Sequence, residues 1–170
     1  MRRWIVVVSL LWWSPALAVP EYPQLIAVSG SPVYYDPGGD SNYFFYDGMY
    51  WIYRDDAWFT GAWFDGPWRA VSPLTVPVYI LRIPVRFYRH PPAAFQDWNA
   101  DEPPRWGDRW GNEWALLRRG WERWERTSAP RPAPLPVYQK DYAGSRYPGP
   151  ELQATLREEN YPYESQDILR

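Results

Sequence analysis

The residue types that most often carry enzyme chemistry are scarce in this 170-residue chain. It has no Cys and a single His, His90, which stands directly before Pro91-Pro92. Nucleophilic catalysis needs a base beside the nucleophile, and no G-x-S-x-G elbow is present. A lone His next to prolines is more often a surface or packing residue than a base. The sequence therefore predicts no catalytic residue, no cofactor and no enzyme activity.

Carboxylates are more plentiful, and we considered two kinds of chemistry for them. No segment has the spacing of acids, Gly and Glu that an EF-hand calcium loop requires. Glycoside cleavage needs two carboxylates held at a fixed separation, and nothing in the chain fixes such a pair. We interpret these acids as turn residues and predict no metal site. The acids considered are Asp36, Asp40, Asp47, Asp55, Asp56, Asp65, Asp101 and Glu102.

Aromatic side chains are unusually abundant, with 13 Trp, 14 Tyr and 6 Phe. Exposed rings can stack on sugars or dock a protein, whereas buried rings would form the core that the scarce Leu and Ile cannot. Because a sheet has two faces and only one predicted helix covers it, we expect some rings to be exposed. The predicted ligand or partner surface consists of Tyr50, Trp51, Trp58, Trp63 and Trp68.

These rings belong to a segment with strand-like patterning, residues 33–68. Two aromatic runs flank Asp47-Gly48, a dipeptide typical of a type I′ hairpin turn. Arg54-Asp55-Asp56 marks the next turn, and two further short strands are expected on either side of Thr60-Gly61. The pattern predicts a small antiparallel β-meander, which needs a cover on one face to be stable.

Residues 72–90 show mixed periodicity. Alternation from Tyr79 to Phe87 fits a strand, whereas the spacing over Leu74–Leu81 fits a helical turn. Pro84 is incompatible with a central strand. We expect a short turn or helix near Leu74–Leu81, followed by an extended segment at the edge of the sheet.

The clearest periodic element follows Pro103-Pro104. Apolar residues recur there every three or four positions, which predicts an amphipathic helix of about twenty residues with Asp101 as a plausible cap. Glycines within it weaken the helix, so its stability must come from docking on the meander. The predicted structural stripe consists of Trp106, Trp110, Trp114, Leu117, Trp121 and Trp124.

Alternating prolines over residues 127–137 predict an extended strap or linker. A short helix is expected from Pro150 to Glu159, and two alternatives stay open for the tail, whose tyrosines either pack back onto the domain or belong to a partly disordered segment. The predicted fold class is α+β: a small antiparallel aromatic β-meander packed on one amphipathic Trp-stripe helix, with a Pro-rich strap and a partly irregular C-terminal tail. The predicted organisation is a signal peptide (1–18), an extended lead-in (19–32), an aromatic α+β domain (33–126), the linker (127–137) and the tail (138–170).

Residues 1–18 have the pattern of a cleavable secretory signal. Arg2-Arg3 precedes an apolar run over Trp4–Trp13, and Ala16-Leu17-Ala18 provides the small residues of a cleavage site. The apolar run is too short to cross a bilayer as a helix, so no stable membrane insertion is expected after cleavage. The pattern predicts a periplasmic protein, with full secretion as the alternative. Cleavage leaves a net charge of about −4, which argues against nucleic acid as a partner.

Several aromatic, Gly and Pro motifs resemble those of a group of small exported proteobacterial proteins that are classed only as hypothetical. The resemblance implies an exported, single-domain protein, and it implies no functional residue because the group has no assigned activity. The motifs are Tyr46-Asp47-Gly48, Gly66-Pro67-Trp68, the segment from Val76-Pro77 to Tyr88, Pro103-Pro104-Arg105-Trp106-Gly107 with Trp110-Gly111, and the stretch from Ala133-Pro134-Leu135-Pro136 to Tyr147-Pro148.

Taken together, the sequence predicts a non-enzymatic exported envelope protein that serves as a protein-interaction or scaffold module. The alternative is a binding module for cell-wall glycan or exopolysaccharide that acts through exposed Trp and Tyr rings. The glycan alternative requires that two or three rings of the meander be exposed and roughly coplanar.

Overall fold

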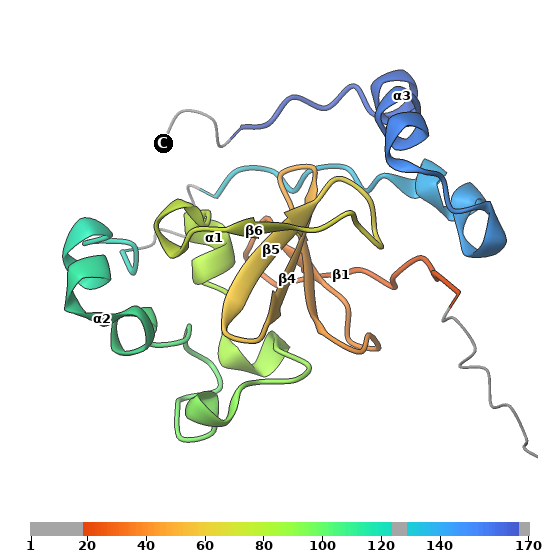
Figure 1. The fold of residues 1–170 in the computed structure, drawn as a ribbon. Coiled ribbons are helices and arrows are strands. Elements are labelled where there is room, and N and C mark those ends of the chain that lie inside the picture. Colours follow the sequence, from red (N-terminus) through yellow and green to blue (C-terminus); the bar gives the residue numbers. More distant parts are fainter. Residues whose placement is uncertain (1–18, 124–128, 167–170) are drawn as a thin grey trace, which may run out of the picture.

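The computed structural model describes residues 19–123 and 129–166, so the predicted signal peptide lies outside the described residues. A six-stranded antiparallel sheet forms the centre, and each strand pairs with its neighbours in sequence (Figure 1). The predicted α+β meander is confirmed. Within the described ranges, no helix combines the length and apolarity needed to cross a bilayer. The strands are β1 (Ile26–Ala27), β2 (Tyr34–Tyr35), β3 (Asn42–Tyr46), β4 (Met49–Arg54), β5 (Ala57–Gly61) and β6 (Arg69–Val71).

Two tight turns set the register of the central strands. Asp47 and Gly48 have φ of 50° and 78°, and Asp55 and Asp56 have φ of 49° and 61°. Consecutive positive φ values are what type I′ turns require, so both predicted turns are confirmed. The predicted break at Thr60-Gly61 is wrong: β5 continues through both residues, because Thr60 pairs with β4 and its hydroxyl donates to the Tyr50 carbonyl oxygen at 2.9 Å. The strand expected after Gly61 is also wrong, because residues 62–64 belong to no strand and the next one, β6, begins at Arg69.

The first face of the sheet packs against residues 73–121. Its cover comprises η1 (Pro73–Thr75), α1 (Val78–Leu81), η2 (Val85–Phe87), η3 (Ala93–Phe95) and α2 (Trp106–Leu117). Helical structure over residues 74–81 was predicted and is confirmed. The expected extended edge segment is wrong, because the backbone N–H groups of Val85 and Arg86 donate to the carbonyl oxygens of Glu102 and Ala100 instead of joining a strand.

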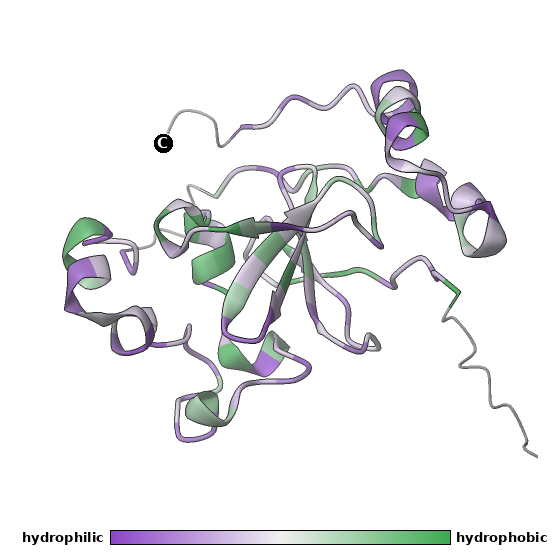
Figure 2. Ribbon diagram, viewed as in Figure 1, coloured by the Kyte–Doolittle hydropathy of each residue, from purple (hydrophilic) through white to green (hydrophobic). Residues whose placement is uncertain are grey.

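The Trp-stripe helix is shorter than predicted and is kinked. Gly111 lies inside α2 with φ of 84° and ψ of 175°, a conformation that favours glycine and that turns the following residues off a straight helical path. As a result Leu117 is 64% exposed, and the end of α2 far from the sheet carries a hydrophobic segment (Figure 2). Asp101 does not cap the helix, since Arg105 occupies the N-cap position.

The remaining members of the predicted stripe do belong to the core. Trp106, Trp114 and Trp121 are buried, and Trp110 is half-buried with its ring stacked on Trp106 at a centroid distance of 4.3 Å. Trp124 lies outside the described residues.

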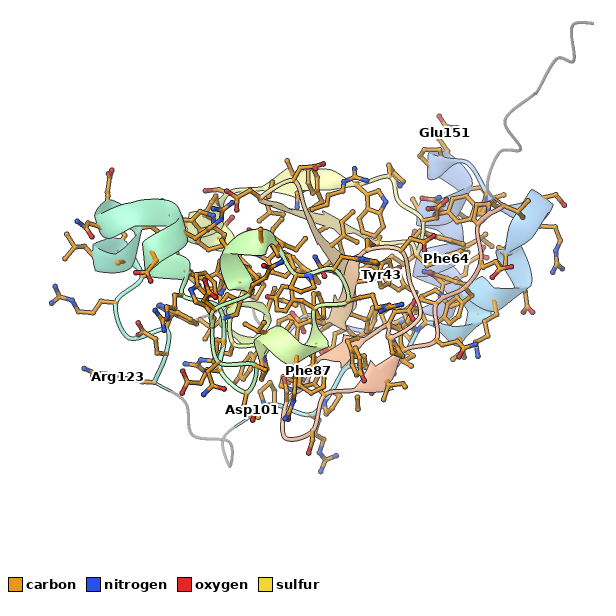
Figure 3. The ribbon with its side chains drawn as sticks, turned by 90° about the horizontal axis from the view of Figure 1, so that it is seen from below. Tyr43, Phe64, Phe87, Asp101, Arg123 and Glu151 are labelled. Carbon is orange, nitrogen blue, oxygen red and sulfur yellow. The ribbon has the colours of Figure 1, made fainter. Side chains whose placement is uncertain are left out.

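The second face of the sheet is covered as well, by the C-terminal part of the chain. Residues 129–136, η5 (Val137–Tyr142), η6 (Gly144–Arg146) and α3 (Pro150–Asn160) supply this cover, and α3 matches the predicted short helix. Figure 3 places Tyr43 and Phe64 beside these elements, whereas Phe87 of η2 lies with the cover of the first face. The expectation that one face exposes rings is therefore wrong.

Two buried glutamines join the C-terminal segment to the sheet. Gln139 accepts a hydrogen bond from the Tyr50 hydroxyl at 3.0 Å and donates to the Ala62 carbonyl oxygen at 3.1 Å. Gln153 donates to the Gly66 carbonyl oxygen at 3.1 Å, and its own carbonyl oxygen accepts the Trp63 indole N–H at 3.1 Å. The segment predicted as linker and tail thus packs into a core cluster through residue 163, and contacts continue to residue 166.

The buried tyrosines lead us to expect cooperative unfolding at alkaline pH. Burial raises the pKa of Tyr43, Tyr50 and Tyr88 well above the ordinary value of 10.0. Above that value the unfolded chain releases protons that the folded chain keeps, so stability falls as pH rises. Each of these tyrosines should lower the free energy of unfolding by about 1.4 kcal/mol per pH unit. The last phase of tyrosinate absorbance should coincide with the loss of near-ultraviolet circular dichroism; complete ionisation of all the tyrosines with unchanged dichroism would contradict this expectation.

Candidate functional site

The five rings predicted as a ligand or partner surface do not form an exposed platform. Tyr50, Trp51, Trp58 and Trp63 are buried, with at most 7% of their surface accessible, and Trp68 is half-buried against the second-face cluster. The set is also divided, because Trp51 and Trp58 pack on the first face whereas Tyr50 and Trp63 pack on the second. The prediction of an exposed ring platform is wrong, because both faces are covered.

Two of the polar residues considered for catalysis or metal binding, His90 and Asp36, have structural contacts. The His90 ring nitrogen Nε2 lies 3.3 Å from the Gly39 carbonyl oxygen, and the Asn42 side chain hydrogen-bonds both backbone groups of His90. The Asp36 carboxylate accepts the Gly38 N–H at 3.0 Å, as a turn residue does. No three His, Asp or Glu side chains gather as a metal site would need in the part of the chain that the structure describes.

The most cationic cavity is a groove of about 510 Å³, which we call the arginine groove. Five parts of the chain contribute to it: the turn between β3 and β4, the segment from η1 to α1, the residue after α2, the helix α3, and residues 163–165. Three guanidinium groups and several rings line it. The lining includes Arg82, Arg118, Arg157, Tyr46, Asp47, Met49, Trp51, Tyr79, Tyr163 and Ser165.

Arg157 is held in this groove by neutral groups. Its guanidinium donates to the carbonyl oxygens of Gly48 at 2.9 Å and Ala62 at 3.4 Å, and it lies over the Tyr161 ring at 5.0 Å. No described carboxylate pairs with Arg157, whereas Arg86 and Arg109 pair with Asp101 and Asp56. A half-buried guanidinium with neutral acceptors keeps donors and charge for an anion that enters the groove.

The other two arginines are fixed by backbone carbonyl groups. Arg118 donates to the carbonyl oxygens of Leu74 at 2.9 Å and Val76 at 2.8 Å, which ties the end of α2 to η1. Arg82 donates to the carbonyl oxygens of Trp121, at 2.5 Å, and of Arg123. Desolvation lowers the pKa of Arg82 below its ordinary value, and the side chain stays protonated at neutral pH. These contacts hold two cations on the wall of the groove.

Asp47 is the one carboxylate among the described residues that line the groove, and it is hydrogen-bonded by residues 163–166. It accepts hydrogen bonds from the Tyr163 hydroxyl at 2.9 Å, the Gln166 N–H at 2.9 Å and the Ser165 hydroxyl. These residues belong to the irregular segment that follows α3 and runs back over the sheet in the view of Figure 1. These donors stabilise the Asp47 carboxylate in its charged form, and this one carboxylate stands against three guanidinium groups in the groove lining, so the lining carries an excess of positive charge.

A second, apolar cavity adjoins the arginine groove. Its volume is about 330 Å³, and it shares Met49 and Arg157 with the groove. We call it the α3 pocket, because Pro150 and Ala154 of α3 form one wall and Ala62, Trp63 and Pro67 form the other. Arg157 therefore stands between a cationic groove and an apolar pocket.

Sequence reasoning missed all three arginines. They come from the end of α1, the end of α2 and the middle of α3, and no motif or periodicity relates them. The signal available in the sequence was the large excess of Arg over the single Lys140. Arg is the residue type that favours bound anions, but the excess does not indicate which arginines form a site.

Comparisons with known proteins give no family. No protein-family model matches this sequence, and searches among curated proteins and solved structures found no significant match. The resemblance to small exported proteobacterial proteins therefore stays a prediction, and the functional argument depends on the arginine groove.

Proposed function

We propose that this protein is a non-enzymatic, exported interaction module that binds an acidic peptide segment of a partner protein in the arginine groove. The observation that carries the proposal is Arg157, a half-buried cation whose acceptors in the described chain are all neutral. Export to the periplasm is part of the proposal and depends on the secretory pattern of residues 1–18.

Charge complementarity supports an anionic ligand. Guanidinium groups bind carboxylates through paired, charge-assisted hydrogen bonds, which are about twice as strong as neutral ones. Arg82 and Arg118 add positive charge to the same groove, and Asp47 accepts three hydrogen bonds from residues 163–166. Although the whole chain is acidic, this surface favours anions because its charges are local.

The apolar part of the lining supports a peptide rather than a simple anion. Trp51, Tyr79 and Met49 line the groove beside the cations. In an extended peptide whose sequence alternates acidic and apolar residues, the two kinds of side chain point to opposite sides, so such a peptide can contact a cationic wall and an apolar wall at once. A glycan module would instead need exposed coplanar rings, and four of the five rings predicted for it are buried.

Replacing Arg157 by Gln should weaken binding of an acidic peptide by about tenfold or more, because a charge-assisted hydrogen bond is lost. The probe is a short fluorescent peptide in which Glu alternates with Leu, and anisotropy gives the dissociation constant. The same peptide with Gln in place of Glu should bind the unaltered protein weakly.

Two variants and one further ligand complete this test. Arg146→Gln removes an exposed arginine of η6 outside the groove and should leave binding unchanged, and Arg157→Lys should retain part of the affinity. Melting curves establish that each variant is folded. Equal binding of the Glu and Gln peptides would overturn the proposal, as would binding of a polyuronate such as alginate without binding of the peptide.

A further inference from the structure

We infer that the arginine groove and the α3 pocket together read a two-part motif: an acidic residue on Arg157 with an apolar side chain next to it in the pocket. This inference depends on the proposed function and names the class of peptide that the site accepts. The two cavities are adjacent, because Met49 and Arg157 line both.

The floor of the α3 pocket presents carbon rather than free polar groups. The Gln153 side-chain amide donates to the carbonyl oxygens of Gly66 at 3.1 Å and Pro148 at 3.0 Å. The Trp63 indole N–H donates to the Gln153 carbonyl oxygen at 3.1 Å, and the Thr60 hydroxyl donates to the Tyr50 carbonyl oxygen at 2.9 Å. Since these donors are already used, an apolar occupant gains more from this pocket than a polar one.

The lining of the pocket also includes two arginines. Arg157 stands at the side shared with the groove, and the exposed Arg69 of β6 is a second lining residue. A volume of about 330 Å³ accommodates a Leu or Val side chain. The lining therefore suits an apolar residue that has acidic neighbours in the peptide.

The arrangement depends on tertiary structure that fixes α3 against the sheet. Arg157 donates to the carbonyl oxygens of Gly48 and Ala62, and Trp63 hydrogen-bonds Gln153. Ala154 is exposed on α3 and lines the pocket, so its small side chain leaves the opening clear. A larger side chain at this position would fill the pocket without touching the guanidinium groups of Arg82 and Arg118.

The test compares two fluorescent peptides, one alternating Glu with Leu and the other alternating Glu with Ser. The unaltered protein should bind the Glu–Leu peptide roughly tenfold more tightly, because one apolar side chain is buried. Ala154→Phe should remove this preference while retaining the discrimination between Glu and Gln peptides. Thr155→Phe changes the next exposed position of α3, which does not line the pocket, and should keep the preference.

The outcomes separate this inference from the proposed function. Equal affinity for the Glu–Leu and Glu–Ser peptides, with discrimination of Glu from Gln intact, would overturn the two-part motif alone. A preference for Leu that survives Ala154→Phe would also overturn it, because the apolar side chain would then bind elsewhere. Loss of Glu–Gln discrimination in the unaltered protein would overturn the proposed function itself.

Discussion

Replacing Trp106 by Ala should lower the free energy of unfolding by about 3–5 kcal/mol, a large fraction of the stability of an ordinary domain. Trp106 is fully buried, and its indole N–H donates to the Leu81 carbonyl oxygen at 2.8 Å. Its ring packs against Tyr53 and Phe95 at centroid distances of 5.4 and 5.7 Å. The substitution therefore removes a large ring and leaves a buried carbonyl oxygen without its donor. Urea denaturation followed by far-ultraviolet circular dichroism measures the change.

Leu117→Ala is the matched control for this substitution. Both residues belong to one stripe if the helix is straight, but Leu117 is 64% exposed because Gly111 breaks the helical path. We expect Leu117→Ala to change the free energy of unfolding by no more than about 0.5 kcal/mol. If both variants lost several kcal/mol of unfolding free energy, the result would contradict the kinked helix and support a continuous helix with Leu117 in its buried stripe.

Removing residues 129–170 should prevent cooperative folding. Tyr43, Phe45, Tyr50 and Ile52 are buried under the C-terminal segment, and their exposure would create an apolar sheet face. Burial of each such side chain stabilises the fold by about 1.5–3 kcal/mol, so together they match the whole stability expected of a domain. The shortened chain should bind a hydrophobic dye, lack near-ultraviolet dichroism and show no sharp thermal transition.

Complementation provides the control for this truncation. Residues 129–170 supplied as a separate peptide should restore near-ultraviolet dichroism, because the contacts that cover the second face do not depend on chain continuity. A shortened chain that melts cooperatively at the temperature of the full chain would show instead that the segment is an appendage, as the division into linker and tail implied.

The meander was predictable because its signals are local. Asp47-Gly48 and Arg54-Asp55-Asp56 specify tight turns, and the aromatic runs beside them have strand periodicity. The kink of α2 was not predictable, because a glycine in a periodic segment either weakens a helix or breaks it, and the local pattern around Gly111 does not distinguish the two outcomes.

The cover of the second face was also beyond local reasoning. Its specific contacts are made by Gln139 and Gln153, two polar residues in a segment whose prolines and tyrosines indicate an extended chain. Buried glutamines cannot be recognised until the groups that they bond are known. The predicted ligand surface failed for this reason: the rings of the meander were counted correctly, but the residues that bury them were not identified.

The arginine groove illustrates the same limit for function. Arg82, Arg118 and Arg157 meet only because α1, α2 and α3 pack around the turn between β3 and β4. Each guanidinium is positioned by backbone carbonyl groups, and such acceptors leave no trace in the sequence. Sequence reasoning could predict an interaction module in general terms, whereas the surface that serves it had to come from the fold.

The measurement that tests the central claim most directly is amide hydrogen exchange of the full chain with and without the Glu–Leu peptide. We expect the peptide to slow exchange in residues 46–49, 75–82 and 153–157, which line the arginine groove and the α3 pocket. Exchange at η3 (Ala93–Phe95), which lines neither cavity, should be unchanged. Protection confined to other surfaces, or no protection at peptide concentrations that saturate the anisotropy signal, would contradict the assignment of this groove as the binding site.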